Sequence, residues 1–313
     1  MRTPTTENLN AWRANSIDKP AAWHHPLSAR ALTALDSLVR TAHADQTVTA
    51  MQINKDVAAA CADDVAPILA ALETGRGFII LTAGQADRYS TRQWQIAYWL
   101  IGQLLGQPIE QNTQSTLLYD VRDTGQDVRY GARFSLTNSE SSFHTDNSFG
   151  SEVCDYVGLL CLHGAKSGGH SQLVSGQTVQ QELQTHHRSA WELLRQPFHI
   201  DRRGGIRPGE GPTAHVPILE GDGPALVIRY LRYWIEVGQE KVGQPLTAAQ
   251  IDALNTLDRV ASEPALRVEF TLNPGEMLFI NNRWILHNRT GFEDFAEAER
   301  KRHLSRLWVR RLA

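Results

Sequence analysis

The pattern of this 313-residue chain changes near Leu117, and the change limits the folds open to it. Beyond that point, short runs of β-branched and aromatic residues are separated by Gly, Asn, Asp and Pro, which is typical of a β-sandwich or β-barrel. The expected strands are Tyr156 to Leu162, Gln172 to Val174, Phe198 to Asp201, Val216 to Leu219, Ala225 to Tyr230, Arg267 to Leu272, Met277 to Ile280, Trp284 to Leu286 and Leu304 to Val309.

Helical periodicity dominates the residues before this change. Apolar side chains recur at three- and four-residue spacing in Ala29 to Val39 and Val57 to Leu72, and Trp94 to Leu105 reads as an apolar helix that ends at Gly106. Between them, Phe78 to Leu81 is predicted to be a buried strand. These elements predict helices packed against a sheet.

Two further helical patterns, Thr178 to Leu194 and Leu246 to Val260, lie between expected strands. They are better interpreted as helical insertions between the strands of one barrel than as separate domains. The fold class is therefore expected to be mainly β with flanking α-helices. We predict a single domain over residues 1–313, in which a helical part of about 1–110 packs on a β core of about 111–313.

Charge and hydropathy exclude several classes of function. The chain has 31 Lys and Arg against 34 Asp and Glu, a net charge of -3, so it lacks the basic surplus of nucleic-acid-binding proteins. The first residues are polar and unlike a signal peptide, and no apolar run approaches the roughly 18 residues of a membrane span. The three cysteines have no metal-site spacing and suit reduced thiols. A cytoplasmic protein without membrane or nucleic-acid partners is expected.

Phe143 to Asn147 contains the pattern His-x-Asp. Residues two apart on an extended segment point the same way, so His144 and Asp146 could bind one metal ion. The pattern is common by chance, and the same side chains can satisfy backbone groups in a turn. A metal site therefore needs a third ligand from elsewhere.

His287 is the best candidate for that ligand. Pro274-Gly275 predicts a turn, an apolar strand follows, and Asn281-Asn282 predicts a second turn, so that His287 would end the returning strand of a hairpin. The alternative is a partly exposed histidine near a strand end. Two neutral imidazoles and one carboxylate leave three positions of an octahedral ion open, which favours Fe(II) with O2 and a reducing co-substrate, whereas zinc is more often tetrahedral.

Arg302 and Arg306 lie four residues apart and share one face if they belong to a strand. A guanidinium that points into a barrel requires an anion, and a carboxylate would supply it through paired hydrogen bonds. The alternative is that both face solvent or pair with Glu293 and Asp294.

Several ordered motifs resemble the TauD/TfdA family of Fe(II)/2-oxoglutarate-dependent dioxygenases over most of the chain. They are GRGFIILTA at 75–83, FHTD at 143–146, YVGLLCL at 156–162 followed by AKSGGHS at 165–171, NPGEMLFINN at 273–282, HNRTGFED at 287–294 and RHLSRLW at 302–308. The resemblance implies a double-stranded β-helix, a cupin-like jelly roll flanked by helices. Relatives often form homodimers or tetramers.

The resemblance also implies roles for individual residues. His144, Asp146 and His287 would bind Fe(II), whereas Arg302 and Ser171 would bind the distal carboxylate of 2-oxoglutarate. The other end of the keto acid would chelate the iron. Asp146 stands where halogenating members have a small residue, which argues against halogenation.

The resemblance implies oxidation of a small-molecule substrate, by default hydroxylation, with release of succinate and CO2. Arg306 falls where some members contact an acidic substrate, and Arg133 could meet a polar one. Asn282 is expected to shape the hairpin or support a ligand. Variable loops at 111–136 and 202–214 are expected to form the substrate pocket.

Two alternatives from other classes remain. A jelly-roll hydrolase or isomerase with another divalent ion would leave Arg302 and Ser171 without an anion to bind. A catalytically silent binding module would be expected to have lost a ligand, yet all three are present.

Overall fold

The computed structural model describes residues 9–126, 134–203, 205–206 and 209–312. Three helices form the N-terminal part: α1 (Ala29–Thr41), α2 (Lys55–Glu73) and α3 (Thr91–Leu105). The helices begin at Ser28, Asn54 and Ser90, whose side chains each accept a hydrogen bond from a backbone N–H of the first turn. The helices predicted from apolar spacing are confirmed.

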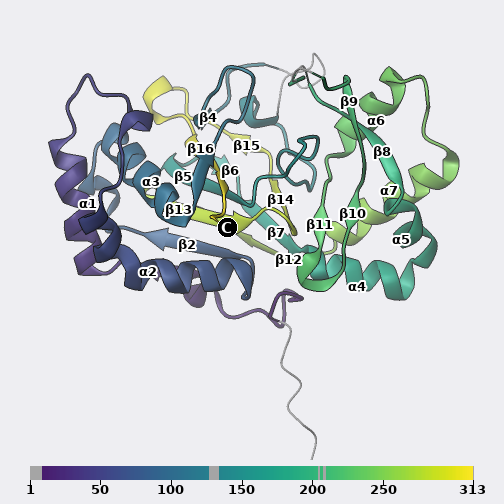
Figure 1. The fold of residues 1–313 in the computed structure, drawn as a ribbon, viewed down its shortest axis with the longest axis horizontal. Helices are drawn as coiled ribbons and strands as arrows, with labels where there is room; N and C mark the ends of the chain where they lie inside the picture. The colour runs from purple at the N-terminus through teal and green to yellow at the C-terminus, as the bar shows by residue number, and fades with distance from the viewer. Residues whose placement is uncertain (1–8, 127–133, 204, 207–208, 313) are drawn as a thin grey trace, which may run out of the picture.

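The largest sheet has the strand order β1-β2-β13-β5-β16-β3, and β4 pairs with β16 beside β3. Its strands are β1 (His24–Pro26), β2 (Phe78–Thr82), β3 (Gln107–Ile109), β4 (Leu118–Val121), β5 (Tyr156–His163), β13 (Glu276–Asn281) and β16 (His303–Arg310). Helices α1 to α3 cover one face of this sheet (Figure 1). Because both faces are covered, β13 and β5 are buried almost throughout.

The opposite face of the large sheet packs toward a second layer. This layer contains a sheet in the order β12-β7-β14, and the described residues also form three separate two-stranded pairs, β8-β9, β10-β11 and β6-β15. The strands of this sheet and these pairs are β6 (Ser167–Gly168), β7 (Ser171–Ser175), β8 (Pro197–Asp201), β9 (Thr213–Pro217), β10 (Leu219–Glu220), β11 (Val227–Ile228), β12 (Arg267–Phe270), β14 (Ile285–Arg289) and β15 (Phe292–Glu293). The two layers form the predicted jelly roll.

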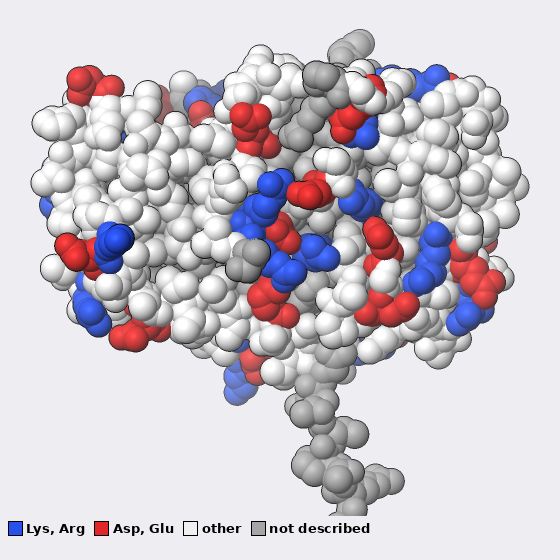
Figure 2. All heavy atoms as spheres, viewed as in Figure 1, with Lys and Arg blue, Asp and Glu red and all other residues white. Residues whose placement is uncertain are grey.

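Four more helices lie at the far end of the molecule, on the green side of Figure 1. They are α4 (Gly176–His186), α5 (Arg188–Leu194), α6 (Arg232–Lys241) and α7 (Ala248–Ala261). Short 3-10 turns occur at Pro20–Trp23, Val48–Ala50, Ala86–Arg88, Phe134–Leu136, Gly223–Ala225 and Ala298–Arg300. Within the described residues, no helix has both the length and the apolar character to cross a membrane. On the face drawn in Figure 2, basic and acidic side chains are interspersed.

Some sequence predictions differ from the structure. The helix predicted over 178–194 is two helices, because the backbone leaves helical geometry at His187 (φ -138°, ψ 49°). The strand predicted over 225–230 is confined to Val227–Ile228, and α6 was not predicted.

The predicted hairpin that leads to His287 is wrong. β13 pairs with β2 and β5 in the large sheet, whereas β14 pairs with β7 in the other sheet. The chain therefore crosses between the two layers at Asn281-Asn282 instead of folding back beside itself. β14 continues to Arg289, so His287 lies in the middle of its strand and not at the end.

Candidate metal centre

His144 and His287 lie side by side because their backbones pair directly. The His144 N–H donates to the carbonyl of His287 at 3.0 Å, and the His287 N–H donates to the carbonyl of His144 at 2.9 Å. Residues paired directly across two antiparallel strands project from the same face. Their ring centroids are accordingly 4.3 Å apart.

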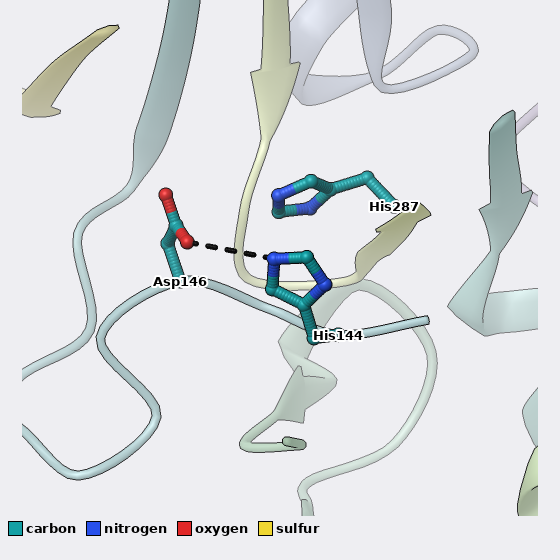
Figure 3. A group of neighbouring side chains, drawn as sticks. All are labelled: His144, Asp146 and His287. Atoms are coloured by element: carbon teal, nitrogen blue, oxygen red, sulfur yellow. Dashed lines mark ion pairs between the residues drawn. The ribbon is translucent and has the colours of Figure 1, made fainter. Parts of the chain in front are cut away.

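Asp146 completes a convergent group of three side chains (Figure 3). One potential ligand atom from each of His144, Asp146 and His287 lies within 4.8 Å of the other two. The Oδ1 atom of Asp146 is 3.7 Å from Nε2 of His144. The three residues predicted as metal ligands are thus brought together.

The protonation states of this group suit a metal ion. Burial lowers the pKa of His144, and burial followed by the charge of His144 lowers the pKa of His287 from 6.5 to about 3. Burial alone would raise the pKa of Asp146, but Arg306, the two imidazoles and a Trp308 hydrogen bond outweigh it and lower the pKa to about 2. Near neutral pH the group therefore holds two neutral imidazoles and one carboxylate.

The backbone between these side chains is fixed by buried hydrogen bonds. The hydroxyl of Thr145 donates to the carbonyl of Ile228 at 2.8 Å, and the Thr145 N–H donates to the carbonyl of Tyr230 at 2.9 Å. Asn282 accepts from the Asp146 N–H at 2.8 Å and donates to the Asp146 carbonyl at 3.0 Å. Asn282, at the crossover between layers, therefore holds the peptide groups on both sides of the Asp146 side chain.

Arg306, predicted to contact substrate, lies against the Asp146 carboxylate. Its Nη1 is 3.1 Å from Oδ2 of Asp146, and its Nε donates to Oε1 of Gln111 at 2.8 Å. Trp308, two residues further on β16, donates from Nε1 to the same Oδ2 at 2.8 Å. Sequence reasoning did not find the Trp308 contact. The available signal was the period of two that puts Trp308 on the Arg306 face of the strand.

A cavity of ≈150 Å³ opens beside the three convergent side chains. Arg302, Arg306 and Ser171 all line it, together with His144, Asp146 and His287. Phe134 and Ser135 reach it from one predicted pocket loop and Arg203 from the other. Asn147, Phe149, Leu231 and Trp234 also line it and were not predicted. Arg133 lies outside the described residues.

Arg302 carries a buried charge with an unused donor. The residue is 5% exposed, and its Nη1 has no hydrogen-bond partner among the residues that the structure describes. Burial lowers the pKa of Arg302. The alternative that Arg302 pairs with Glu293 is wrong, because Glu293 pairs with Lys166 at 2.6 Å, and Asp294 accepts from the Arg302 backbone and not from its guanidinium. Such a donor fits an incoming carboxylate, since an unpaired buried charge is costly.

A jelly roll with two neutral imidazoles and one carboxylate converging beside a cavity defines the class of mononuclear non-haem iron enzymes. The donor set fits Fe(II), and the buried arginine beside it fits a carboxylate co-substrate. A family model described as "Taurine catabolism dioxygenase TauD, TfdA family" matches residues 43–308. The chain belongs to this family, and it is an Fe(II)/2-oxoglutarate-dependent dioxygenase.

Individual relatives agree with this assignment. FR-33289 synthase of Streptomyces rubellomurinus (strain ATCC 31215) is 28% identical over 250 residues, which cover 78% of this chain and 72% of the relative. Enduracididine beta-hydroxylase of Streptomyces hygroscopicus is 26% identical over 247 residues, or 71% of this chain and 67% of the relative. Neither the non-redox metal enzyme nor the silent binding module is favoured.

Solved structures support the fold. An asparagine oxygenase in complex with Fe(II), 2S,3S-3-hydroxyasparagine and succinate superposes with a TM-score of 0.71 at 19% identity, covering 92% of this chain and 93% of that chain. The non-haem iron oxygenase OrfP in complex with Fe and alpha-ketoglutaric acid gives a TM-score of 0.68 at 17% identity, with the same coverage.

Proposed function

We propose that this chain hydroxylates a small polar molecule, with His144, Asp146 and His287 holding Fe(II). Arg302 and Ser171 would receive the distal carboxylate of 2-oxoglutarate. The observation that carries the proposal is the buried Nη1 of Arg302, unpartnered within the described part of the chain, in the same cavity as the three convergent side chains. Neither feature alone would distinguish an oxygenase from another metal enzyme.

When bound, the ferrous ion supplies the redox chemistry that couples O2 to oxidation of the keto acid and of the substrate, with release of succinate and CO2. The protein residues bind and orient. The two neutral imidazoles and the Asp146 carboxylate hold the ion from one side. The Arg302 guanidinium fixes the far end of the keto acid through charge-assisted hydrogen bonds, and Ser171, 7% exposed, adds a hydroxyl.

The walls of the cavity would hold the substrate and exclude water. Apolar side chains of Val157, Leu159 and Leu304 form one part of the wall, whereas Asn147 and Ser148 add polar groups. Such a site binds the apolar body of a ligand by burial and orients it by a few polar contacts.

Amino acids are the first substrate class to test. One relative is named a beta-hydroxylase of enduracididine, and solved neighbours contain 2S,3S-3-hydroxyasparagine or (3S)-hydroxy-L-Arg. We propose an amino acid or a comparably small polar metabolite. A second, more polar cavity of ≈760 Å³ shares Asn147, Phe149, Arg203 and Trp308 with the first, which gives a longer substrate room to extend.

We also propose that residues 1–313 form one domain. The N-terminal strands β1, β2 and β3 pair within the same sheet as β13 and β16, which supports a shared core. We propose a cytoplasmic enzyme without nucleic-acid or membrane partners, and a homodimer or tetramer is the oligomer to test for.

The decisive experiment measures succinate release by purified protein with Fe(II), 2-oxoglutarate and a panel of amino acids, sulfonates and aryloxy acids. Asp146→Ala should abolish substrate-dependent succinate release, because the ion loses its only carboxylate ligand. Asp63→Ala, which changes an exposed acid on α2 with 88% of its side chain accessible, should retain it. An Asp146→Ala variant as active as the wild type would disprove the proposal.

A further inference from the structure

The two carboxylate oxygens of Asp146 have different surroundings. Oδ1 lies 3.7 Å from Nε2 of His144, on the side of the convergent group, and accepts a hydrogen bond from Nη1 of Arg306 at 3.4 Å. Oδ2 accepts a hydrogen bond from Nε1 of Trp308 at 2.8 Å and lies 3.1 Å from Nη1 of Arg306. Arg306 therefore contacts both oxygens, whereas the Trp308 N–H donates to Oδ2 alone and Oδ1 lies beside the imidazoles.

The two donors to Oδ2 are held in place by the large sheet. Trp308 and Arg306 lie two apart on β16, which pairs with β5 along most of its length. The side chain of Gln111 braces Arg306 in both directions, accepting from its Nε at 2.8 Å and donating to its carbonyl at 2.8 Å. Trp308 is 5% exposed and Gln111 is 2% exposed, so water competes little for these contacts.

We propose that Trp308 is a positioning residue for the metal-binding carboxylate. Its indole N–H would occupy Oδ2, so that Asp146 binds the ion through Oδ1 alone. An indole N–H is a donor only and cannot itself become a ligand, so it orients the carboxylate without competing for the metal. The inference rests on the proposed function, and it gives a reason why the Asp146 carboxylate must keep one orientation.

That reason is the number of positions left open on the ion. Three protein ligand atoms on one face of an octahedral ion leave three positions, which a chelating keto acid and O2 fill. A carboxylate that bound through both oxygens would take one of those positions. Keeping Oδ2 engaged by Trp308 therefore keeps the site open for both co-substrates.

The test is Trp308→Phe, which removes the N–H and retains most of the ring. Isothermal titration of the metal-free protein with Co(II), used as an oxygen-stable probe, should give an affinity about 10- to 100-fold weaker than that of the wild type. Titration of the Co(II)-loaded protein with 2-oxoglutarate should also show weaker binding, because the released Oδ2 competes for a coordination position.

Trp94→Phe is the matched control. Trp94 is 4% exposed, and its Nε1 donates to the Ala86 carbonyl at 3.0 Å. It packs in the core between the large sheet and helices α1 to α3, away from the cavity. This variant should lose similar stability while its Co(II) affinity stays that of the wild type. If Trp308→Phe does not fold, replacement of Trp308 by β-(3-benzothienyl)alanine, which exchanges the N–H for sulfur at nearly constant shape, makes the same test.

A folded variant without the N–H that binds Co(II) and 2-oxoglutarate as tightly as the wild type would overturn the inference and leave the proposed function intact. The proposed function itself would fail through a different result, namely equal Co(II) affinity of the wild type and Asp146→Ala.

Discussion

Replacing Asn282 by alanine should separate the contribution of the crossover to folding from its contribution to the metal site. Asn282 is fully buried, at 0% exposure. Its amide accepts from the Asp146 N–H at 2.8 Å and donates to the carbonyls of Asp146 at 3.0 Å and Cys154 at 3.1 Å. The amide also donates to Sγ of Cys154 at 3.2 Å, and alanine removes all of these contacts and adds none.

The expected loss follows from the groups left behind. One N–H and two carbonyls become unpaired, and each unpaired buried polar group costs about 1–3 kcal/mol. The free energy of unfolding should therefore fall by at least about 3 kcal/mol, even where water partly replaces the amide. This is a large fraction of the roughly 5–15 kcal/mol that stabilises an ordinary domain.

Urea unfolding of the metal-free protein, followed by tryptophan fluorescence, measures this loss. Asn281→Ala is the neighbouring control, since the Asn281 amide donates only to the Leu72 carbonyl and accepts from the Arg283 N–H, away from Asp146. It should cost less stability and leave Co(II) affinity unchanged, whereas Asn282→Ala should weaken Co(II) binding as well. A loss below about 1 kcal/mol in Asn282→Ala, with normal Co(II) affinity, would refute the reasoning.

Two further predictions concern the co-substrate and pH. Arg302→Met should raise the KM for 2-oxoglutarate about 10- to 100-fold, since charge-assisted hydrogen bonds contribute about 1.5–3 kcal/mol. The variant should leave turnover with 2-oxovalerate, which lacks the distal carboxylate, nearly unchanged. An equal loss of activity with both keto acids would contradict this prediction. Burial and the neighbouring His144 lower the pKa of His287 from 6.5 to about 3. Between these two pH values His287 of the unfolded chain takes up a proton, whereas His287 of the folded chain does not. The free energy of unfolding of the metal-free protein should therefore fall as the pH is lowered through this range. His287→Gln should flatten that fall in urea unfolding measured at several pH values, and an unchanged slope would contradict the assignment.

Much of the fold could be predicted because it depends on local pattern. The N-terminal helices follow apolar spacing and begin at side-chain caps, both of which are properties of neighbouring residues. The hairpin was predicted wrongly for the same reason. Asn281-Asn282 has the composition of a tight turn, and local turn chemistry is the same whether the next strand returns beside the first or crosses to another sheet.

The candidate site divides in a similar way. His144 and Asp146 could be found because two-residue spacing on an extended segment is a local property. The period of two places Trp308 on the same strand face as Arg306, but it does not show that this face meets Asp146, since Arg306 and Trp308 are 160 and 162 residues away in sequence. In the sequence, Trp308 resembles an ordinary core aromatic residue. The strand order is needed to show that its N–H points to Asp146.

The error about the hairpin also explains how the site is assembled. β13 belongs to the large sheet and β14 to the smaller one, so the chain leaves the large sheet a few residues before His287. The residue at that crossing, Asn282, holds the backbone of Asp146, while β16 of the large sheet holds the Asp146 carboxylate. The proposed ligand set therefore depends on both layers at fixed separation and, within the loop at 111–136, on Gln111, which holds Arg306 against Asp146. Substitutions of cavity-lining loop residues such as Ser135 and Arg203 should change which molecule is oxidised without changing metal affinity, whereas substitution of Asn282 should weaken metal binding.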